Sequence, residues 1–364
     1  MLIAIDGFEI GENSTGVGRV TDNIVRWLVD LMPEHEFLLC TREKIKSYPG
    51  KNITQHVISS PAKYFRWQNG PFVKKITKAD PDILIAPNYT VPFFNKWKTV
   101  LIEHDVSFVS HPEWFSKKEA TVKKYLVKRS LKKSTVVVTM SAFSRDEIIK
   151  NFRIESDKIN VMYLGVEDKF QKIPEDETNS WKEKRGLKNK KIIGYLGSVF
   201  NRRNIPLLVE SVELVRNELP EVVLYIIGED CTHPPQNIAR VLNRDWIKWE
   251  TSIEEKDLPL FYSSVDAFAF LSEYEGFGLP PLEALACGTV PVLLNRASLK
   301  EIFRDMAIMV DDPDVMEVKK ALKAAITDEG KKEVLLGRFE EKRSYYSWSR
   351  AAREFLSFLK KCAA

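Results

Sequence analysis

"EYEGFGLPPLEALACG", residues 273–288, carries two carboxylates, Glu275 and Glu283, on either side of a glycine and double-proline turn. The preceding run VDAFAFLS is typical of a buried strand. PLEALACG is typical of a helix, with Pro281 suited to the first helical position and Gly288 suited to end it. The turn is therefore expected at the carboxyl end of a strand, where doubly wound parallel sheets bind ligands.

The turn itself has the properties of a phosphate site. Gly276 and Gly278 allow a backbone to approach a ligand closely and can adopt positive φ. The helix start offers unpaired N–H groups and a partial positive charge that suit a pyrophosphate. Glu283, expected in the first turn, would repel phosphate, so we expect it to accept hydrogen bonds from a ribose diol, with Glu275 on the other side of the phosphates. Such a ligand is a nucleotide sugar.

A structural interpretation of the same residues is that Glu283 complements the helix dipole and Glu275 is an exposed loop charge. For either glutamate alone, this interpretation is favoured. The whole string favours a ligand site, because spacing, glycines and prolines coincide in one strand-turn-helix context.

The segment closely resembles the E-x7-E signature of retaining GT-B glycosyltransferases of the family 4 type. Other blocks that resemble the same family extend from residue 6 to beyond residue 310, so the likeness covers most of the chain. It is specific for fold and reaction class, and much less so for the sugar. The further blocks are STGVGRVTDNI, IEHDVSFVSHPEWF, VTMSAFSRDEI, KINVMYLGVE and GYLGSVFNRRNIPLLVES.

The resemblance implies two Rossmann-like parallel-sheet domains that face a cleft. It also implies that the N-terminal glycine loop faces the donor phosphates and the acceptor, although a tight turn alone would explain its two glycines. The donor-binding residues that it implies are Gly16, Gly18, Ser198, Glu275, Gly276, Phe277, Gly278, Leu279 and Glu283.

Arg202 and Arg203 follow a predicted strand and turn in the block that resembles the family's phosphate loop. Two guanidinium groups suit bidentate contact with a pyrophosphate and would neutralise the charge of a departing nucleotide diphosphate. The family usually has Arg-Lys here. Arg203 therefore keeps the charge but replaces a point charge with a planar fork.

His104 ends the predicted strand in TVLIEHD. A lone histidine is more often a packed or surface residue. Its match to the family's sugar-facing histidine makes it a candidate for contact with the donor sugar, and together with Glu275, Arg202 and Arg203 it forms the expected catalytic set.

The length of 364 residues favours two domains. Short apolar runs alternate with amphipathic stretches in two series, which indicates an α/β protein with two doubly wound sheets. Helices are expected at 17–32, 117–133 and 142–152. The expected organisation is an acceptor-side domain at 1–169, a charged linker at 170–189, a nucleotide-sugar domain at 190–345 and a C-terminal helix at 346–364. This helix either caps the second domain or crosses back to the first, and crossing back is favoured.

Composition narrows the function classes. The four cysteines are far apart, which argues against a disulfide framework or zinc site and favours the cytoplasm. No secretory signal or membrane span is predicted. Asp80-Pro81-Asp82 and Asp312-Pro313-Asp314 are interpreted as turn chemistry, so neither a metal nor another cofactor is expected.

The net charge of +4 is concentrated in the N-terminal half, most densely in the helix predicted at 117–133. That helix is either a solvated amphipathic helix or a surface for anionic lipid head groups at the inner face of the membrane. Nucleic acid is not expected, because no recognition motif is present. The aromatic residues Tyr64, Phe65, Trp67 and Phe72 are either packed or membrane-facing, with packing favoured.

The expected reaction transfers a hexose from a nucleotide diphosphate sugar to a hydroxyl of a glycan or lipid-linked acceptor, with retention. Mannose from GDP-mannose is the first choice, because the motifs look most like bacterial mannosyltransferases of polysaccharide and O-antigen assembly. UDP-glucose, UDP-GlcNAc and dTDP-rhamnose stay open as donors. A sugar phosphorylase or sugar-phosphate synthase, a nicotinamide dehydrogenase and a non-catalytic scaffold are the alternatives, and the dehydrogenase lacks the third glycine of its motif.

Overall fold

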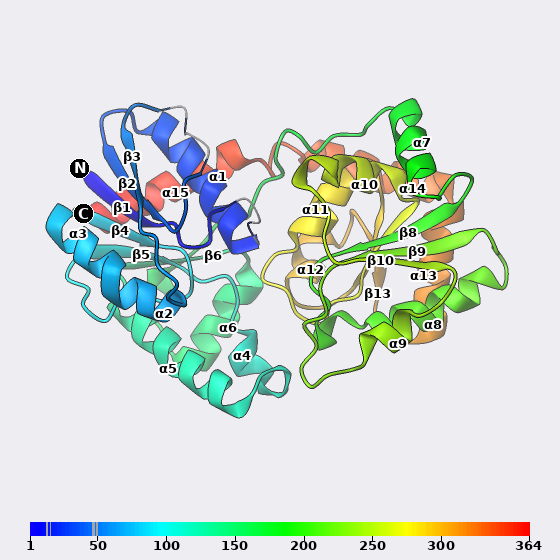
Figure 1. Cartoon of the computed structure of the whole chain (residues 1–364), viewed down its shortest axis with the longest axis horizontal. Coiled ribbons are helices and arrows are strands. Elements are labelled where there is room, and N and C mark those ends of the chain that lie inside the picture. Colours follow the sequence, from blue (N-terminus) through cyan, green and yellow to red (C-terminus); the bar gives the residue numbers. More distant parts are fainter. Residues whose placement is uncertain (12–13, 15, 46–47, 49) are drawn as a thin grey trace. The chain divides into compact units, whose positions relative to one another are not determined.

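The computed structural model of the chain describes residues 1–11, 14, 16–45, 48 and 50–364. These residues divide into two compact units, each built on a parallel sheet (Figure 1). Unit 1 comprises Met1–Pro112, Lys117–Gly165 and Tyr346–Ala364, and unit 2 comprises Glu113–Ser116 and Val166–Tyr345. The predicted α/β architecture with two parallel sheets is confirmed.

The sheet of unit 1 has seven parallel strands in the order β3-β2-β1-β4-β5-β6-β7. The direction of strand addition therefore reverses between β1 and β4. Most strands are buried on both faces, which is why they read as continuous apolar runs in the sequence. The strands are β1 (Leu2–Asp6), β2 (Glu36–Thr41), β3 (Ile53–Val57), β4 (Ile83–Ala86), β5 (Lys98–Ile102), β6 (Val136–Thr139) and β7 (Ile159–Val161).

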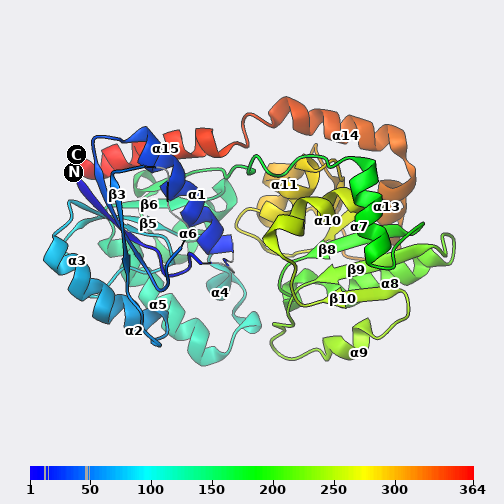
Figure 2. The same cartoon turned by 45° about the horizontal axis from the view of Figure 1, so that its top comes forward.

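Helices cover both faces of this sheet. Figures 1 and 2 show α1 and α15 on one side of it, and α2, α3 and α5 on the other. The three helices predicted in this half form with ends within one residue of the prediction. The helices are α1 (Gly16–Leu31), α2 (Tyr64–Trp67), α3 (Val73–Ala79), α4 (Ser107–Ser110), α5 (Lys117–Lys133), α6 (Ala142–Phe152) and α15 (Trp348–Ala363), with a π-helical turn at Gln68–Phe72 and short 3-10 turns at Pro112–Trp114 and Ser156–Lys158.

The aromatic residues at 64–72 divide between the core and the surface. Trp67 and Phe72 are fully buried and stack with ring centroids 4.9 Å apart, in a core that includes Ala4, Leu38 and Leu84 of the sheet. The hydroxyl of Tyr64 donates to Asp6 Oδ2. Phe65 is 45% exposed. Packing is therefore the correct interpretation for all but Phe65.

The C-terminal helix α15 belongs to unit 1, as predicted. The hydroxyl oxygen of Ser347 caps its first turn by accepting from the backbone N–H of Arg350. One face, including Ala351, Phe355 and Leu359, is buried, and the helix packs against α1, β5 and β6. The backbone at Gly165 passes close to the start of this helix. A Cβ on Gly165 would lie 2.1 Å from the backbone nitrogen of Trp348.

The sheet of unit 2 has six parallel strands in the order β10-β9-β8-β11-β12-β13. Here the direction of strand addition reverses between β8 and β11. Such a reversal separates the two loops that follow the strands and leaves a crevice at their carboxyl ends. The strands are β8 (Lys191–Leu196), β9 (Val222–Ile227), β10 (Ile247–Glu250), β11 (Ala267–Phe270), β12 (Pro291–Leu294) and β13 (Ile308–Val310).

Helices also cover both faces of the second sheet. Helices α8 and α13 pack together against one face, and α10 and α11 cover the other (Figure 2). The helices are α7 (Glu175–Lys184), α8 (Ile205–Arg216), α9 (Ile238–Leu242), α10 (Leu258–Ser264), α11 (Leu279–Ala286), α12 (Ala297–Phe303), α13 (Val315–Thr327) and α14 (Glu329–Lys342), with 3-10 turns at Asn201–Arg203 and Glu255–Asp257.

The predicted linker at 170–189 is wrong, because this segment is a folded part of unit 2. It contains α7, which packs on α10 and buries Trp181 to 5% exposure. Arg185 lies over the Trp181 ring and pairs with Asp257 at 3.2 Å. The segment is so rich in charge that its pattern resembled a linker, although Phe170, Trp181 and Leu187 are buried and anchor it on unit 2.

Candidate functional site

The stretch at 273–288 lies at the carboxyl end of β11, beside the loop that follows β8. These two strands are neighbours at the point where strand order reverses in unit 2. Open α/β sheets bind their ligands at this point. The residues predicted from the phosphate loop and from the E-x7-E stretch are thus brought to one edge of one sheet.

Arg203 and Glu275 form an ion pair across this edge. Arg203 Nε lies 3.1 Å from Glu275 Oε1, and the two side chains are only 11% and 14% exposed. Arg203 Nη1 donates to the carbonyl oxygen of Ser198 at 2.9 Å. Burial alone would lower the pKa of the Arg203 guanidinium, but the Glu275 carboxylate and the Tyr195 hydroxyl outweigh burial and raise it. Arg203 is therefore a fixed cation that holds Glu275.

Local backbone geometry explains why Arg203 can lie there. Gly197 follows β8 with φ 134°, and a Cβ at this position would lie 2.3 Å from Arg203 Nη1. Asn204 is also left-handed, with φ 52°, and its side-chain amide donates to the Leu271 carbonyl and to Glu273 Oε1 at 3.1 Å each. The loops after β8 and β11 are thereby tied together.

Two serines hold Glu275 in addition to Arg203. Ser272 Oγ donates to Glu275 Oε1 at 2.8 Å, and Ser298 Oγ donates to the Glu275 carbonyl at 2.7 Å and to that of Phe277 at 3.2 Å. Both serines are fully buried. The sequence analysis missed them. Ser272 could have been predicted, because it stands only three residues before Glu275. Ser298, on α12, is in no motif that would have pointed to Glu275.

Arg202 differs from its neighbour. Its guanidinium carbon lies 4.5 Å from the centre of the Phe200 ring. Its buried Nε has no hydrogen-bond partner among the described residues. An unpartnered guanidinium nitrogen is suited to an anionic ligand. Of the two arginines, Arg202 is thus the freer one, while Arg203 already donates to protein atoms.

The start of α11 offers fewer amides than the sequence analysis expected. The helix begins at Leu279, so Pro280 and Pro281 occupy its second and third positions and have no N–H. The first turn therefore presents the amide of Leu279 alone. Gly278 has φ 111°, as expected for the turn, but its missing Cβ makes room for Leu299 and Phe303 of the protein.

Glu283 is not in the first turn of α11, and it is not at the surface. It lies in the second turn, is 1% exposed, and its Oε2 accepts from the Tyr262 hydroxyl at 2.8 Å. Tyr262 is itself fully buried on α10. The predicted position of Glu283 in the first turn, from which both the ribose contact and the dipole interpretation were argued, is therefore wrong.

Unit 1 presents polar groups at its own reversal point. Asn88, after β4, donates from Nδ2 to Glu9 Oε1 at 3.1 Å, which joins the segments that follow β1 and β4. Gly18 approaches the same segment, because a Cβ on it would lie 2.1 Å from the Glu9 carbonyl oxygen. Gly16 has nothing within 4 Å of such a Cβ. Both predicted glycines lie in the first turn of α1, and part of the loop before them, residues 12, 13 and 15, lies outside the described residues.

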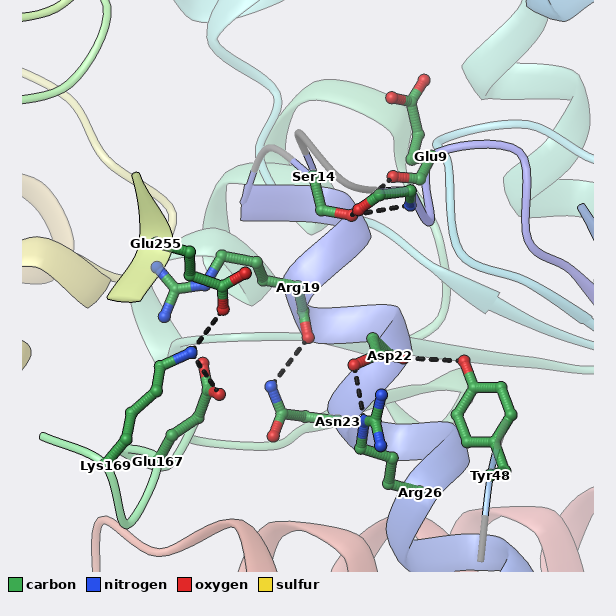
Figure 3. A network of polar contacts seen from close by, with 11 residues as sticks. Glu9, Ser14, Arg19, Asp22, Asn23, Arg26, Tyr48, Glu167, Lys169 and Glu255 are labelled. Carbon is green, nitrogen blue, oxygen red and sulfur yellow. Dashed lines mark hydrogen bonds and ion pairs between the residues drawn. The ribbon is translucent and has the colours of Figure 1, made fainter. Parts of the chain in front are cut away.

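Figure 3 shows the polar contacts that fix this region. Ser14 Oγ lies against the carbonyl oxygens of Glu9, at 3.3 Å, and Gly11. Farther along α1, Asp22 accepts from Arg26 Nε and from the Tyr48 hydroxyl at 2.7 Å each. The same figure shows Lys169 of unit 2 bridging Glu167 and Glu255. The segment before α1 is therefore held by side chains at described positions.

His104 follows β5 and is partly buried. Its Nε2 lies 2.8 Å from the carbonyl oxygen of Pro87. A carbonyl can only accept, so Nε2 carries the proton and Nδ1 is the acceptor of a neutral ring. Burial lowers the pKa of His104 despite the Pro87 carbonyl and Asp105, which keeps the ring neutral at pH 7. The ring also packs against Tyr89, with centroids 5.5 Å apart.

Asp6 is a buried carboxyl at the end of β1 that the sequence analysis passed over. It accepts from the Phe8 backbone and from the side chains of Tyr64 and Gln68. Burial raises its pKa to about 6, against the effect of those hydrogen bonds.

The two DxD strings serve as turns. Asp80 ends α3 with φ 47° and pairs with Lys96, Asp82 accepts from the Leu2 backbone, and Asp314 caps α13. The described residues contain no group of three or more His, Cys, Asp or Glu side chains that could hold a metal ion. No helix within the described ranges is long and apolar enough to cross a membrane.

The two α/β units, each built on a parallel sheet, have the fold of the GT-B glycosyltransferases among the solved structures. The chain belongs to the family 4 and group 1 glycosyltransferases. Residues 14–170 match the family described as Glycosyltransferase Family 4, and residues 177–343 match Glycosyl transferases group 1.

The relatives of the chain include O-antigen enzymes. It is 27% identical to O-antigen chain mannosyltransferase B of Escherichia coli over 76% of this chain and 73% of that protein. It is 24% identical to the serotype-specific mannosyltransferase WbdA of Escherichia coli over 97% of this chain, but it spans only 47% of that protein. Among solved structures, Anabaena Alr3699/HepE in complex with UDP and glucose aligns with a TM-score of 0.77 and 16% identity over 99% of both chains, which shows the fold.

Proposed function

We propose that this glycosyltransferase moves a hexose, with mannose from GDP-mannose as the first choice, onto a hydroxyl of a glycan or lipid-linked acceptor, with retention of anomeric configuration. The Arg203–Glu275 pair at the strand reversal of unit 2 is the observation that carries the proposal. The name of the Escherichia coli relative, an O-antigen chain mannosyltransferase, supports the choice of sugar and the role in cell-surface polysaccharide synthesis.

In this proposal Arg202 binds the diphosphate. Its unpartnered Nε and the Leu279 amide would stabilise the negative charge that grows on the departing nucleotide diphosphate. Arg203 contributes to the field at the phosphates and holds Glu275 in place. The leaving oxygen takes the acceptor proton on the same face of the sugar, so no separate base is required.

Glu275 is proposed to orient the donor sugar and to favour positive charge at the anomeric carbon. Its three hydrogen bonds from Arg203, Ser272 and Ser298 fix both its carboxylate and its backbone. A carboxylate held this way requires little reorganisation as charge develops. Positioning and electrostatics would thus provide most of the acceleration.

His104 is proposed to meet a sugar hydroxyl with Nδ1. Because Nε2 donates to the Pro87 carbonyl, the ring can offer an acceptor there but no second proton. Gly16 and Gly18 are proposed to face the donor phosphates and the acceptor. Glu283 would support the donor site from within, through its contact with Tyr262, instead of binding the ribose directly.

The proposal needs neither a metal nor another cofactor. It sets the enzyme in the cytoplasm, at the inner face of the membrane, with the basic helix α5 as the lipid contact. The four free cysteines, of which three are buried, fit a reducing compartment.

A panel of nucleotide sugars tests the proposal. The full chain is incubated with GDP-mannose, UDP-glucose, UDP-GlcNAc and dTDP-rhamnose, with and without a lipid extract, and the released diphosphate is measured. GDP release that depends on the acceptor is expected. NMR of the product should show that the anomeric configuration of the donor sugar is retained. Formation of a hexose 1-phosphate from a glycan and inorganic phosphate would instead favour a phosphorylase, and diphosphate release that requires a phosphosugar acceptor would favour a sugar-phosphate synthase.

Glu275→Gln gives the matched test of the site. Turnover is expected to fall about 100-fold, the usual cost of losing one electrostatic contact in a catalytic site. Glu210→Gln on the exposed face of α8 is the control and should leave turnover unchanged. Equal turnover of the two variants would rule out the role of Glu275.

A further inference from the structure

Unit 1 exposes a group of large apolar side chains. They are Phe65 on α2, Phe93 and Phe94 in the segment after β4, and Val122 and Tyr125 on α5, and each is 45–63% exposed. Figures 1 and 2 show α2 and α5 on the same side of the seven-stranded sheet. We call these five residues, together with the exposed lysines of α5, the aromatic–basic surface.

The aromatic rings of this surface are held outward by specific contacts. Phe65 and Phe93 meet edge to face with centroids 5.8 Å apart, and Asn69 Oδ1 accepts from the Phe93 backbone at 2.7 Å. Arg129 of α5 lies 4.3 Å from the Phe93 ring centre and donates to the carbonyl oxygen of Pro92 at 3.2 Å. The exposed aromatics therefore belong to an ordered segment that is joined to α5 through Arg129.

The charge on α5 beside these rings is mostly positive. In α5, Glu119 is the only acidic residue. None of the exposed lysines of α5 forms an ion pair within the described residues. An excess of unpaired positive charge beside exposed apolar groups complements an anionic surface. These lysines are Lys117, Lys118, Lys124, Lys128, Lys132 and Lys133.

Chemistry distinguishes a lipid surface from a protein partner. Protein interfaces are depleted of lysine in their cores, whereas helices that lie in the membrane interface combine lysine with exposed aromatic and aliphatic residues. Aromatic rings also favour the region of the lipid head groups. Val122 and Tyr125 stand within the row of lysines on α5, so apolar and basic groups would meet the same plane.

We propose that the aromatic–basic surface docks unit 1 on an anionic lipid bilayer. Phe93, Phe94 and Phe65 enter the interface, and the lysines of α5 bind lipid phosphates. This deepens the proposed function, on which it rests for the lipid-linked acceptor, by naming the residues and the two kinds of contact involved.

Vesicle flotation of the full chain, without nucleotide, tests the surface. Vesicles of phosphatidylcholine alone are compared with vesicles that also contain phosphatidylglycerol. Binding is expected only to the anionic vesicles. Phe93→Ser with Phe94→Ser, and separately Lys124→Glu with Lys128→Glu, are each expected to weaken binding about tenfold or more.

Unit 2 provides the matched controls. Met316→Ser with Val334→Ser removes equally exposed apolar groups, and Lys320→Glu with Lys331→Glu reverses exposed charges, so both pairs should bind vesicles like the unmodified chain. No flotation with anionic vesicles, or equal loss in the controls and the surface variants, would overturn the proposal.

A second readout separates this proposal from the proposed function. Nucleotide-sugar turnover with a soluble acceptor is measured for the same variants, and it should not change. Lipid binding without any turnover would support the proposed membrane docking and reject the transferase activity. Turnover without lipid binding would support the transferase activity and reject the membrane docking.

Discussion

Arg203 Nε lies 3.1 Å from Glu275 Oε1, so the arginine for which the family resemblance leads one to expect a lysine also holds the loop glutamate. A lysine ammonium could pair with Glu275, but it could not also present a second planar nitrogen to the Ser198 carbonyl. The substitution is therefore matched to its surroundings, including Gly197, whose missing side chain leaves space for the guanidinium.

Arg203→Lys should retain the fold and reduce kcat/KM about tenfold, because the ammonium keeps the charge but fixes Glu275 less well. Arg203→Ala should be worse in two ways, since it also leaves a largely buried carboxylate unpaired, which costs about 3–5 kcal/mol of unfolding free energy. Urea unfolding together with steady-state kinetics checks both. If lysine and alanine behaved alike in turnover, Arg203 would not act by positioning Glu275.

Gly278→Ala should destabilise the chain by about 1–3 kcal/mol. Its φ of 111° is unfavourable for alanine, and the new Cβ would lie 2.8 Å from a Leu299 methyl carbon. Gly337→Ala in the middle of α14 is the control, because nothing lies within 4 Å of its Cβ and alanine favours a helix. Thermal unfolding should show opposite shifts for the two variants.

The two glycines at the start of α1 should respond differently to substitution. Gly18→Ala places a Cβ 2.1 Å from the Glu9 carbonyl oxygen, so the Glu9 segment must move and unfolding free energy should fall by about 1–3 kcal/mol. Gly16→Ala meets no atom and should be neutral or slightly stabilising. Urea titration of both variants is the measurement. Equal losses would contradict the contact with Glu9.

Asp6 predicts a pH dependence of stability. Its folded pKa, about 6, lies above the ordinary value of 3.8, so its contribution is fully present below about pH 4 and is lost as the pH rises to about 6. The unfolding free energy of the unmodified chain, relative to Asp6→Asn, should therefore fall over this range and then level off. The expected change is on the order of 3 kcal/mol. Urea unfolding at a series of pH values measures it, and a flat difference would be inconsistent with a raised pKa.

Sequence patterns predicted most of the fold for a simple physical reason. Parallel strands are buried on both faces, so runs such as TVVVTMS and AFAFLS contain the strands Val136–Thr139 and Ala267–Phe270. The charged segment at 170–189 was misread, because only a few of its residues are buried, among them Phe170, Trp181 and Leu187, and the ring partners of Trp181 lie far away in the sequence.

The candidate site was predictable only in part. Spacing brought Glu275, Arg202 and Arg203 to one sheet edge, because loops that follow neighbouring parallel strands meet there. The burial of Glu283 depends on Tyr262, 21 residues earlier and outside any motif. The small number of free amides at the start of α11 could have been predicted from Pro280 and Pro281, because proline has no N–H at any position.

The position of α15 sets an order of events during synthesis. Residues Tyr346–Ala364 complete the unit that begins at Met1, by covering α1, β5 and β6. The amino-terminal half therefore cannot reach its final packing on the ribosome until residues 346–364 have emerged, whereas Val166–Tyr345 can close its own core earlier. A nascent chain arrested before residue 346 should thus leave the face of α1 open to chaperones, although all of Val166–Tyr345 has been made.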